Sequence, residues 1–176
     1  MRIYTKSGDT GETGLFLGGR VSKSDSRPEA YGWSDSAISA MGLARALCAD
    51  ERVKSILLKI QREMFTIGAE LATDIDNHET LRDRFGCVTS EMVTGLEETV
   101  DELYATIDLP SEFIVPGASA GSGAIDLART FVRTCERRVT NLNEEKKISN
   151  PNLMKYLNRL SDLLFMLARF EDRGLP

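Results

Sequence analysis

Apolar side chains return every three or four residues along most of this chain, a spacing that predicts amphipathic helices. The most regular series is Leu57, Ile60, Met64, Ile67 and Leu71, which lie on one helical face. No strand ladder and no internal repeat is apparent. We therefore expect an all-α fold, an antiparallel bundle of about five helices with a polar N-terminal arm over residues 1–28. The helices are predicted over about residues 29–48, 51–74, 119–142 and 152–172, with a further one beginning after Thr89 as its N-cap.

The other helical faces expected in the core follow the same spacing. They consist of Ala37, Ala40 and Ala44 in the first helix; Met92, Leu96, Leu103 and Ile107 after Thr89; Leu127, Phe131, Cys135 and Leu142 in the fourth; and Leu153, Tyr156, Leu157, Leu160, Leu163, Leu164, Leu167 and Phe170 in the last.

Composition indicates an ordinary globular protein. The 176 residues suffice for one domain, and 41% hydrophobic with 28% charged residues is a typical balance. A net charge of −5 argues against a dedicated nucleic-acid surface. The three cysteines leave one unpaired in any disulfide scheme, which fits a reducing cytoplasm. Neither an apolar run long enough to span a membrane nor a secretory signal is present, so we expect a cytoplasmic protein that binds no membrane.

The single histidine, His78, restricts the chemistry. It excludes multi-histidine metal sites, including the paired Glu-x-x-His motifs of di-iron bundles, and makes any histidine-based catalysis depend on one residue. Its neighbours, residues 73–80, read as a polar loop between helices, so we assign His78 no role.

Two helices carry polar side chains that suggest a site. Asn158, Ser161 and Asp162 share a face of the last helix although they are poor helix formers, and a solvated face is the alternative. Arg129 and Arg133, followed by Arg137, stack along the fourth helix at intervals of four residues. Their mutual repulsion calls for an anionic partner, either carboxylates such as Glu136 in an ion-pair face or a ligand phosphate.

The N-terminal arm adds groups that suit an anion. In Thr5-Lys-Ser-Gly-Asp-Thr-Gly-Glu-Thr13, glycines allow backbone N–H groups to converge, while lysine and hydroxyl groups supply further donors. Lys23 and Arg27 follow with more positive charge. The Walker pattern is missing, and a floppy solvated terminus is the alternative.

Five segments in order resemble the PduO-type ATP:cob(I)alamin adenosyltransferases over nearly the whole chain. They are Thr5-Lys-Ser-Gly-Asp-Thr-Gly11; Arg20-Val-Ser-Lys23 with Glu29-Ala-Tyr-Gly32; Phe113-Ile-Val-Pro-Gly117; Leu127-Ala-Arg-Thr130 with Glu136-Arg-Arg138; and Tyr156-Leu-Asn-Arg-Leu-Ser-Asp162. The resemblance implies one adenosyltransferase-like domain over residues 1–176, with an ATP-binding arm (1–28) and a ferritin-like five-helix bundle (29–172). It also implies a homotrimer whose active sites lie between neighbouring subunits.

The family reaction needs no histidine base. Cob(I)alamin attacks the 5′ carbon of ATP and expels triphosphate, so the protein has to align the reactants, hold Mg²⁺-triphosphate and exclude water. By resemblance, Arg129 would pair with Asp35 across the interface, Arg133 would meet the phosphates, and Phe113 would face the lower side of the corrin. The metal ligands are not assigned, and a cobalamin reductase and an adenosylcobalamin-dependent enzyme would be the partners. The ATP-binding residues implied are Thr5, Lys6, Ser7, Gly8, Asp9, Thr10, Gly11, Thr13, Lys23, Arg27, Arg133, Glu136 and Asn158.

The chain also departs from the family pattern. Ser34-Asp-Ser-Ala-Ile-Ser39 replaces the usual Val-Asp-Glu-Leu-Asn-Ser, Thr134 replaces an arginine, and Ala118 replaces a glycine. These changes touch the corrin side and the interface more than the ATP side. A non-catalytic ATP-binding paralogue, acting as a nucleotide sensor or a partner-binding bundle, is therefore the alternative function.

Overall fold

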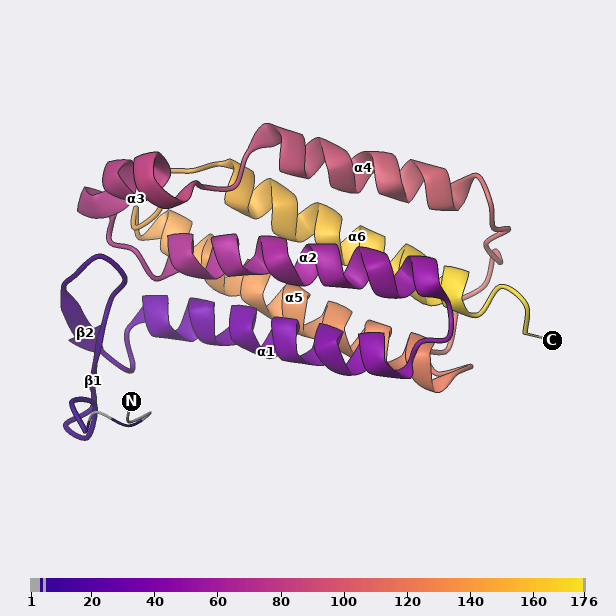
Figure 1. The fold of residues 1–176 in the computed structure, drawn as a ribbon, viewed down its shortest axis with the longest axis horizontal. Coiled ribbons are helices and arrows are strands. Elements are labelled where there is room, and N and C mark those ends of the chain that lie inside the picture. Colours follow the sequence, from indigo (N-terminus) through magenta and orange to yellow (C-terminus); the bar gives the residue numbers. More distant parts are fainter. Residues whose placement is uncertain (1–3, 5, 176) are drawn as a thin grey trace.

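The computed structural model describes residue 4 and residues 6–175, and most of this part of the chain is helical. Five long helices follow one another in alternating directions along the molecule (Figure 1). The short helices η1 and α3 join the second of them to the third. The bounds are α1 (Ser26–Leu47), α2 (Glu51–Leu71), η1 (Ile75–Asn77), α3 (His78–Phe85), α4 (Ser90–Tyr104), α5 (Ala120–Glu144) and α6 (Asn152–Glu171).

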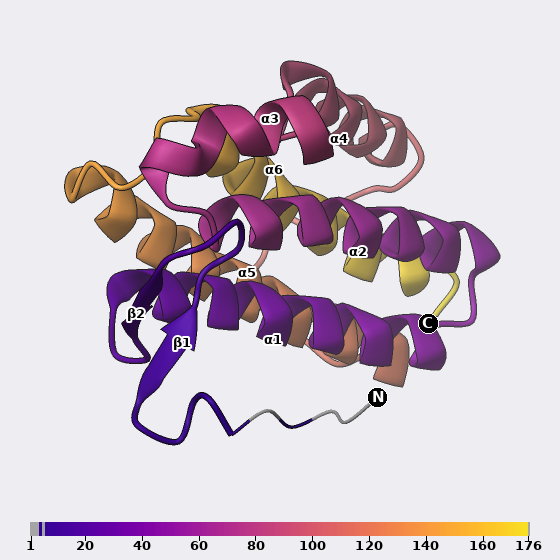
Figure 2. The same ribbon diagram turned by 60° about the vertical axis from the view of Figure 1, so that its left-hand side comes forward.

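Helix α5 holds the bundle together. It packs against both α1 and α6, while α2 packs against α1 and α4 packs against α6. Figure 2 shows the same helices from a second direction, with the N-terminal arm beside the ends of α1 and α2. Within the described residues, no helix is long and apolar enough to cross a membrane.

Helix α3 corrects the expected loop at residues 73–80 and brings the described α-helices to six where five were expected. The Asp74 side chain accepts a hydrogen bond from the N–H of Asp76 at 3.3 Å and starts η1, which runs directly into α3 at His78. Only Leu81 of α3 is buried. One buried position gives no periodicity, so apolar spacing could not reveal this helix.

Three helix ends differ from the prediction, and at the start of α1 a polar side chain explains the difference. Helix α1 begins at Ser26 because the Asp25 carboxylate accepts a hydrogen bond from the N–H of Arg27 at 2.9 Å. Helix α2 ends at Leu71, and helix α4 ends at Tyr104, so Ile107 lies outside it. The expected extensions to residues 74 and 107 were therefore wrong.

The arm contains a hairpin, contrary to the expectation of no strands. Strand β1 (Glu12–Gly14) pairs antiparallel with β2 (Arg20–Ser22), with Thr13 opposite Val21. Phe16, in the turn, donates its N–H to the carbonyl of Ala72 at 2.9 Å and packs edge-on against Phe85, ring centroids 5.0 Å apart. These contacts attach the hairpin to the end of α2 and to α3, so the arm is not a floppy terminus over these residues.

The core follows the predicted faces of α1, α2 and α6, whereas the faces predicted for α4 and α5 are buried only in part. All of the apolar series in α2 and α6 is buried, as are the three alanines of α1. Leu127, expected in the core, is 46% exposed, and Phe131 is only partly buried. The core face of α5 is rotated instead toward Ile125, Ala128, Val132, Cys135, Val139 and Leu142.

Candidate functional site

Arg129 is fixed within its own subunit. Its Nε donates to Asp126 Oδ1 at 3.1 Å, one turn earlier on α5. Asp126 is buried and also accepts a hydrogen bond from Arg169 of α6. Asp35 lies exposed on α1 and makes no side-chain hydrogen bond or ion pair with any described residue. Asp35, the expected partner of Arg129, is therefore available to contact a neighbouring molecule.

Arg133, one turn further along α5, points to solvent. It is exposed and forms no ion pair or side-chain hydrogen bond within the described part of the chain. Arg137 donates to the hydroxyl of Thr134 at 2.9 Å, and Arg138 lies 3.3 Å from Glu29 of α1. Of these three cations, Arg133 is the one with no described side-chain partner of any kind, so its guanidinium is available to an anionic ligand.

Two predicted nucleotide-binding residues meet between α5 and α6. The Asn158 amide donates to Glu136 Oε1 at 3.0 Å, and its oxygen accepts from Arg159 at 2.8 Å. Arg159 is held in turn by Glu97 of α4 at 2.8 Å. Ser161, on the same face, is buried and donates to the Asn158 carbonyl, while Asp162 is exposed. The amide is thus oriented by charged neighbours on both sides.

The arm folds into successive turns beside Lys23. Lys6 and Gly11 have positive φ angles of 61° and 85°, and the N–H of Lys23 donates to the Gly11 carbonyl at 2.8 Å. A Cβ on Gly8 would lie 3.1 Å from Lys23 Nζ, so the lysine crosses this glycine closely. Thr5 lies outside the described residues. The other predicted arm residues therefore share one short region of chain. They are Lys6, Ser7, Gly8, Asp9, Thr10, Gly11, Thr13 and Lys23.

Arg27 differs from the other predicted cations because it is buried. Its guanidinium donates to the carbonyl of Leu71 at 3.2 Å and to that of Lys147. Burial lowers the pKa of Arg27. These contacts join the start of α1 to the end of α2 and to the α5–α6 connection.

Phe113 lies in the loop between α4 and α5 with its ring wholly exposed, at 104% relative accessibility. Val115 in the same loop is 85% exposed. Core packing within the chain, the ordinary explanation for an apolar run, does not apply to either residue. An aromatic ring held in water is available to a ligand or to a neighbouring subunit.

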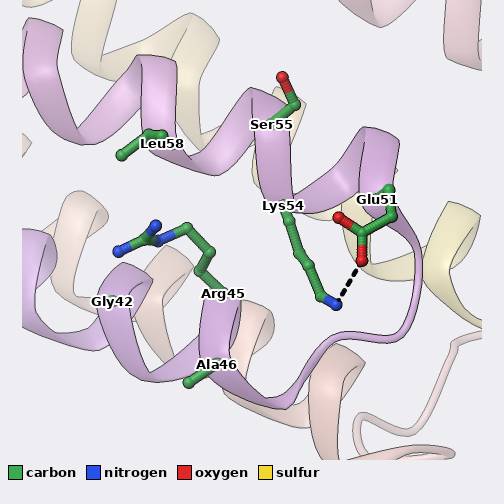
Figure 3. Close-up of a pocket in the computed structure, with 7 residues that line it drawn as sticks. All are labelled: Gly42, Arg45, Ala46, Glu51, Lys54, Ser55 and Leu58. Carbon is green, nitrogen blue, oxygen red and sulfur yellow. Dashed lines mark hydrogen bonds and ion pairs between the residues drawn. The ribbon is translucent and has the colours of Figure 1, made fainter.

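Acid–base and thiol chemistry find little support. Burial raises the pKa of Cys48 and of Cys135 to about 12, so both thiols stay protonated at neutral pH. The groove between α1 and α2 has a volume of about 640 Å³ and none of the predicted site residues (Figure 3). It is lined by Gly42, Arg45, Ala46, Glu51, Lys54, Ser55 and Leu58.

Sequence reasoning missed two residues that organise this region. Arg20 donates to the Ser7 carbonyl at 2.8 Å and pairs with Glu12 at 3.3 Å, which holds the turns of the arm against the hairpin. Asp126 anchors Arg129, and its place three residues earlier on the same helix was a usable signal.

The sequence profile of the cobalamin adenosyltransferase family matches residues 3–171. This chain belongs to that family. It is 40% identical over 98% of its length to the corrinoid adenosyltransferase PduO of Salmonella typhimurium, and 37% identical over 97% to a corrinoid adenosyltransferase of Citrobacter freundii. It spans 50% of the Salmonella protein and 95% of the Citrobacter protein.

Solved structures of the family superpose closely on this fold. A phenylalanine-to-alanine variant of the PduO-type ATP:corrinoid adenosyltransferase of Lactobacillus reuteri, complexed with cobalamin and ATP, gives a TM-score of 0.87 at 32% identity. The match covers 96% of this chain and 92% of that one. An arginine-to-lysine variant of the enzyme from the same organism, complexed with ATP, gives 0.86 with 96% and 93% covered.

Proposed function

We propose that this protein transfers the 5′-deoxyadenosyl group of ATP to cob(I)alamin and forms adenosylcobalamin and triphosphate. Family membership over nearly the whole chain is the observation that carries the proposal. In the reaction the cobalt–carbon bond forms as the bond between the 5′ carbon and the triphosphate oxygen breaks. The electron pair comes from cobalt(I) and leaves with triphosphate, so no side chain has to accept a proton at the reacting carbon.

The residues of α5, α6 and the arm would bind the nucleotide. Arg133 offers a guanidinium that no described carboxylate neutralises, which suits a triphosphate. Lys23 and the turns of the arm add charge and backbone donors, and Mg²⁺ would neutralise part of the remaining phosphate charge. The linked pair Glu136 and Asn158 would position the nucleoside.

Phe113 would lie against the lower face of the corrin. Crowding by the ring would displace the lower axial ligand of cobalt(II) and make its reduction to cobalt(I) easier. Full exposure of Phe113 in the single chain supports this role, because a core phenylalanine could not reach a ligand.

The assembly would be a homotrimer of helical bundles, one domain over residues 1–176 with residues 1–28 as ATP arm and 29–172 as bundle. Asp35 of one subunit would meet Arg129 of the next, and the active site would lie between them. The exposed, unpaired Asp35 supports this arrangement. We place the enzyme in the cytoplasm, where a reductase would supply cobalt(I) and an adenosylcobalamin-dependent enzyme would take up the product.

Anaerobic incubation with chemically reduced cobalamin and Mg-ATP tests the function. We expect the visible spectrum of cob(I)alamin to give way to that of light-sensitive adenosylcobalamin. The alternative, a non-catalytic nucleotide sensor, is favoured by the departures from the family pattern at residues 34–39, Ala118 and Thr134. ATP binding without any spectral change at cobalt would select that alternative.

A further inference from the structure

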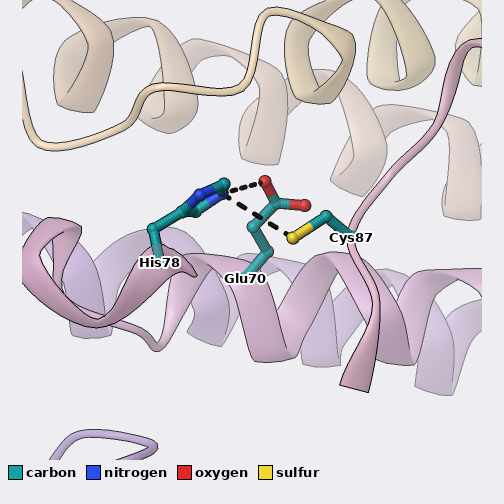
Figure 4. A group of neighbouring side chains, drawn as sticks. All are labelled: Glu70, His78 and Cys87. Atoms are coloured by element: carbon teal, nitrogen blue, oxygen red, sulfur yellow. Dashed lines mark hydrogen bonds and ion pairs between the residues drawn. The ribbon is translucent and has the colours of Figure 1, made fainter. Parts of the chain in front are cut away.

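Three side chains with metal-binding atoms converge away from the proposed adenosyltransfer site. Glu70 comes from the end of α2, His78 from the start of α3, and Cys87 from the segment before α4 (Figure 4). His78 Nε2 lies 2.9 Å from Glu70 Oε1 and 3.7 Å from Cys87 Sγ. The ligand atoms all lie within 4.8 Å of one another.

The carboxylate of Glu70 is buried, with a side-chain exposure of 1%. Its Oε2 accepts the N–H of Val88 at 2.9 Å, which fixes the group and leaves Oε1 facing the histidine and cysteine. Among the described residues His78 is its sole ion-pair partner. The nearby Lys147 is already paired with Asp25 and Glu145, at 3.2 and 2.8 Å. The buried Glu70 carboxylate therefore has no lysine or arginine partner among the described residues to balance its charge.

We propose that Glu70, His78 and Cys87 bind a zinc ion. Imidazole, thiolate and carboxylate are the three ligand types that zinc accepts, at about 2.0–2.3 Å. A tetrahedral site with such bonds separates its ligand atoms by roughly 3.3–3.6 Å. The sulfur–nitrogen distance of 3.7 Å already fits this geometry, and the nitrogen–oxygen distance of 2.9 Å has to widen only slightly.

The fourth position would open toward solvent. His78 and Cys87 line an open groove of about 580 Å³ together with Ser149, Asn150 and Pro151 of the α5–α6 connection. The groove gives zinc a path of entry and gives water access to the last coordination position. Without a metal, burial raises the pKa of Cys87 to about 11, so the thiol keeps its proton until zinc displaces it to solvent.

A metal here would join three consecutive elements. It would tie α3, which buries little of its own surface, to α2 and to the segment that leads into α4. Phe85 at the end of α3 contacts Phe16 of the arm. The zinc site would therefore stabilise the surface on which the arm rests, and it depends on neither ATP nor corrinoid.

Cobalt(II) titration of the chelator-treated protein, free of corrinoid, tests the proposal. We expect one equivalent to give the strong visible bands of a tetrahedral site and a thiolate-to-cobalt charge-transfer band, both removed by one equivalent of zinc. Cys87→Ser should abolish the charge-transfer band, and His78→Gln should weaken binding by more than about 100-fold. Cys48→Ser is the matched control, since it removes a buried thiol outside the cluster and should leave the spectrum unchanged.

Hydrogen exchange gives a second readout. Zinc should slow exchange of the amides of α3 and of Val88 in the unmodified protein and in Cys48→Ser, but not in Cys87→Ser. A weak octahedral cobalt spectrum, or a charge-transfer band that survives in Cys87→Ser, would overturn the proposal. Either result would identify the cluster as a hydrogen-bonded Glu–His pair beside a thiol, and adenosyltransfer would be unaffected.

Discussion

Phe113 keeps its aromatic ring in solvent within the single chain, and this placement gives the sharpest prediction for one side chain. Phe113→Ala should change the free energy of unfolding by less than about 0.5 kcal/mol, as expected of an exposed position. ATP should still bind. The variant should fail to form four-coordinate cobalt(II) cobalamin, measured by visible and electron paramagnetic resonance spectra, and should transfer adenosyl slowly from that starting state.

Val115→Ala is the matched control, because Val115 is also exposed in the same loop. It should leave both spectra as they are in the unmodified protein. A Phe113→Ala protein that melts much earlier yet transfers adenosyl normally would show that the ring packs against protein and not against the corrin.

Arg133 carries a second prediction. If its guanidinium binds the phosphates, Arg133→Ala removes a charge-assisted hydrogen bond of about 1.5–3 kcal/mol, which lowers kcat/KM for ATP roughly 10- to 150-fold. Steady-state kinetics with varied Mg-ATP measure the change. Arg137→Ala serves as control, since Arg137 is exposed on the same helix but bonded to Thr134. Equal effects of the two substitutions would mean a general loss of positive charge and no specific clamp.

Individual residues were predictable where burial follows helical spacing. The apolar stripe of α6 and the exposed Asn158 agree with the pattern. Leu127 does not agree with the pattern. The face of α5 that turns toward the core is decided partly by Asp126, a buried carboxylate that accepts a hydrogen bond from Arg169 of α6. An ion pair between residues so far apart in the chain leaves no local periodicity.

At the scale of elements, the start of α1 depends on Asp25. Its carboxylate accepts the N–H of Arg27 and pairs with Lys147 at 3.2 Å, and the pKa of Asp25 is lowered mainly by that N–H and further by Lys147. Asp25→Ala should reduce the free energy of unfolding by about 0.5–2 kcal/mol, the usual cost of losing an N-cap. Urea denaturation at neutral pH measures the loss.

Asp25→Asn separates the cap from the charge, since asparagine keeps a cap oxygen. Because the folded pKa is lowered, the stability due to the charge is present above the ordinary pKa of 3.8 and is lost as pH falls through the folded pKa. The gap in stability between the unmodified protein and Asp25→Asn should therefore narrow in acid. A gap that stays constant would exclude a contribution from the carboxylate charge.

Long elements were predictable and short ones were not, for physical reasons. Helix α2 displays six buried apolar positions at steps of three and four residues, which few other structures produce. Helix α3 buries only Leu81, and each hairpin strand has three residues, too few for alternation to appear. The hairpin is held in place by Phe16 contacts to Ala72 and Phe85, which are tertiary and absent from any local pattern.

At the scale of the whole molecule, Asp35 tests the assembly. It has no partner among the described residues, while Arg129 is already supported by Asp126, so Asp35→Ala should leave the subunit folded. It should weaken the proposed trimer and lower activity, because Arg129 would lose its proposed partner across the interface. Sedimentation velocity over a range of concentrations would detect the shift from trimer to smaller species.

Asp101→Ala is the control, since it removes an exposed carboxylate on α4, and this variant should sediment as the unmodified protein does. A stable monomer before any substitution would rule out a site shared between subunits.

Adenosyl transfer itself is tested most directly by the fate of the phosphates. Attack of cobalt(I) at the 5′ carbon releases all three phosphates as one unit, whereas a nucleotide-hydrolysing or sensing protein would yield ADP and phosphate or leave ATP intact. Phosphorus NMR of an anaerobic single turnover, recorded beside the visible spectrum, should therefore find one intact triphosphate for each adenosylcobalamin formed. Adenosyl transfer would be contradicted by any of three results: ADP with phosphate, pyrophosphate with phosphate, or unchanged ATP beside unreacted cob(I)alamin.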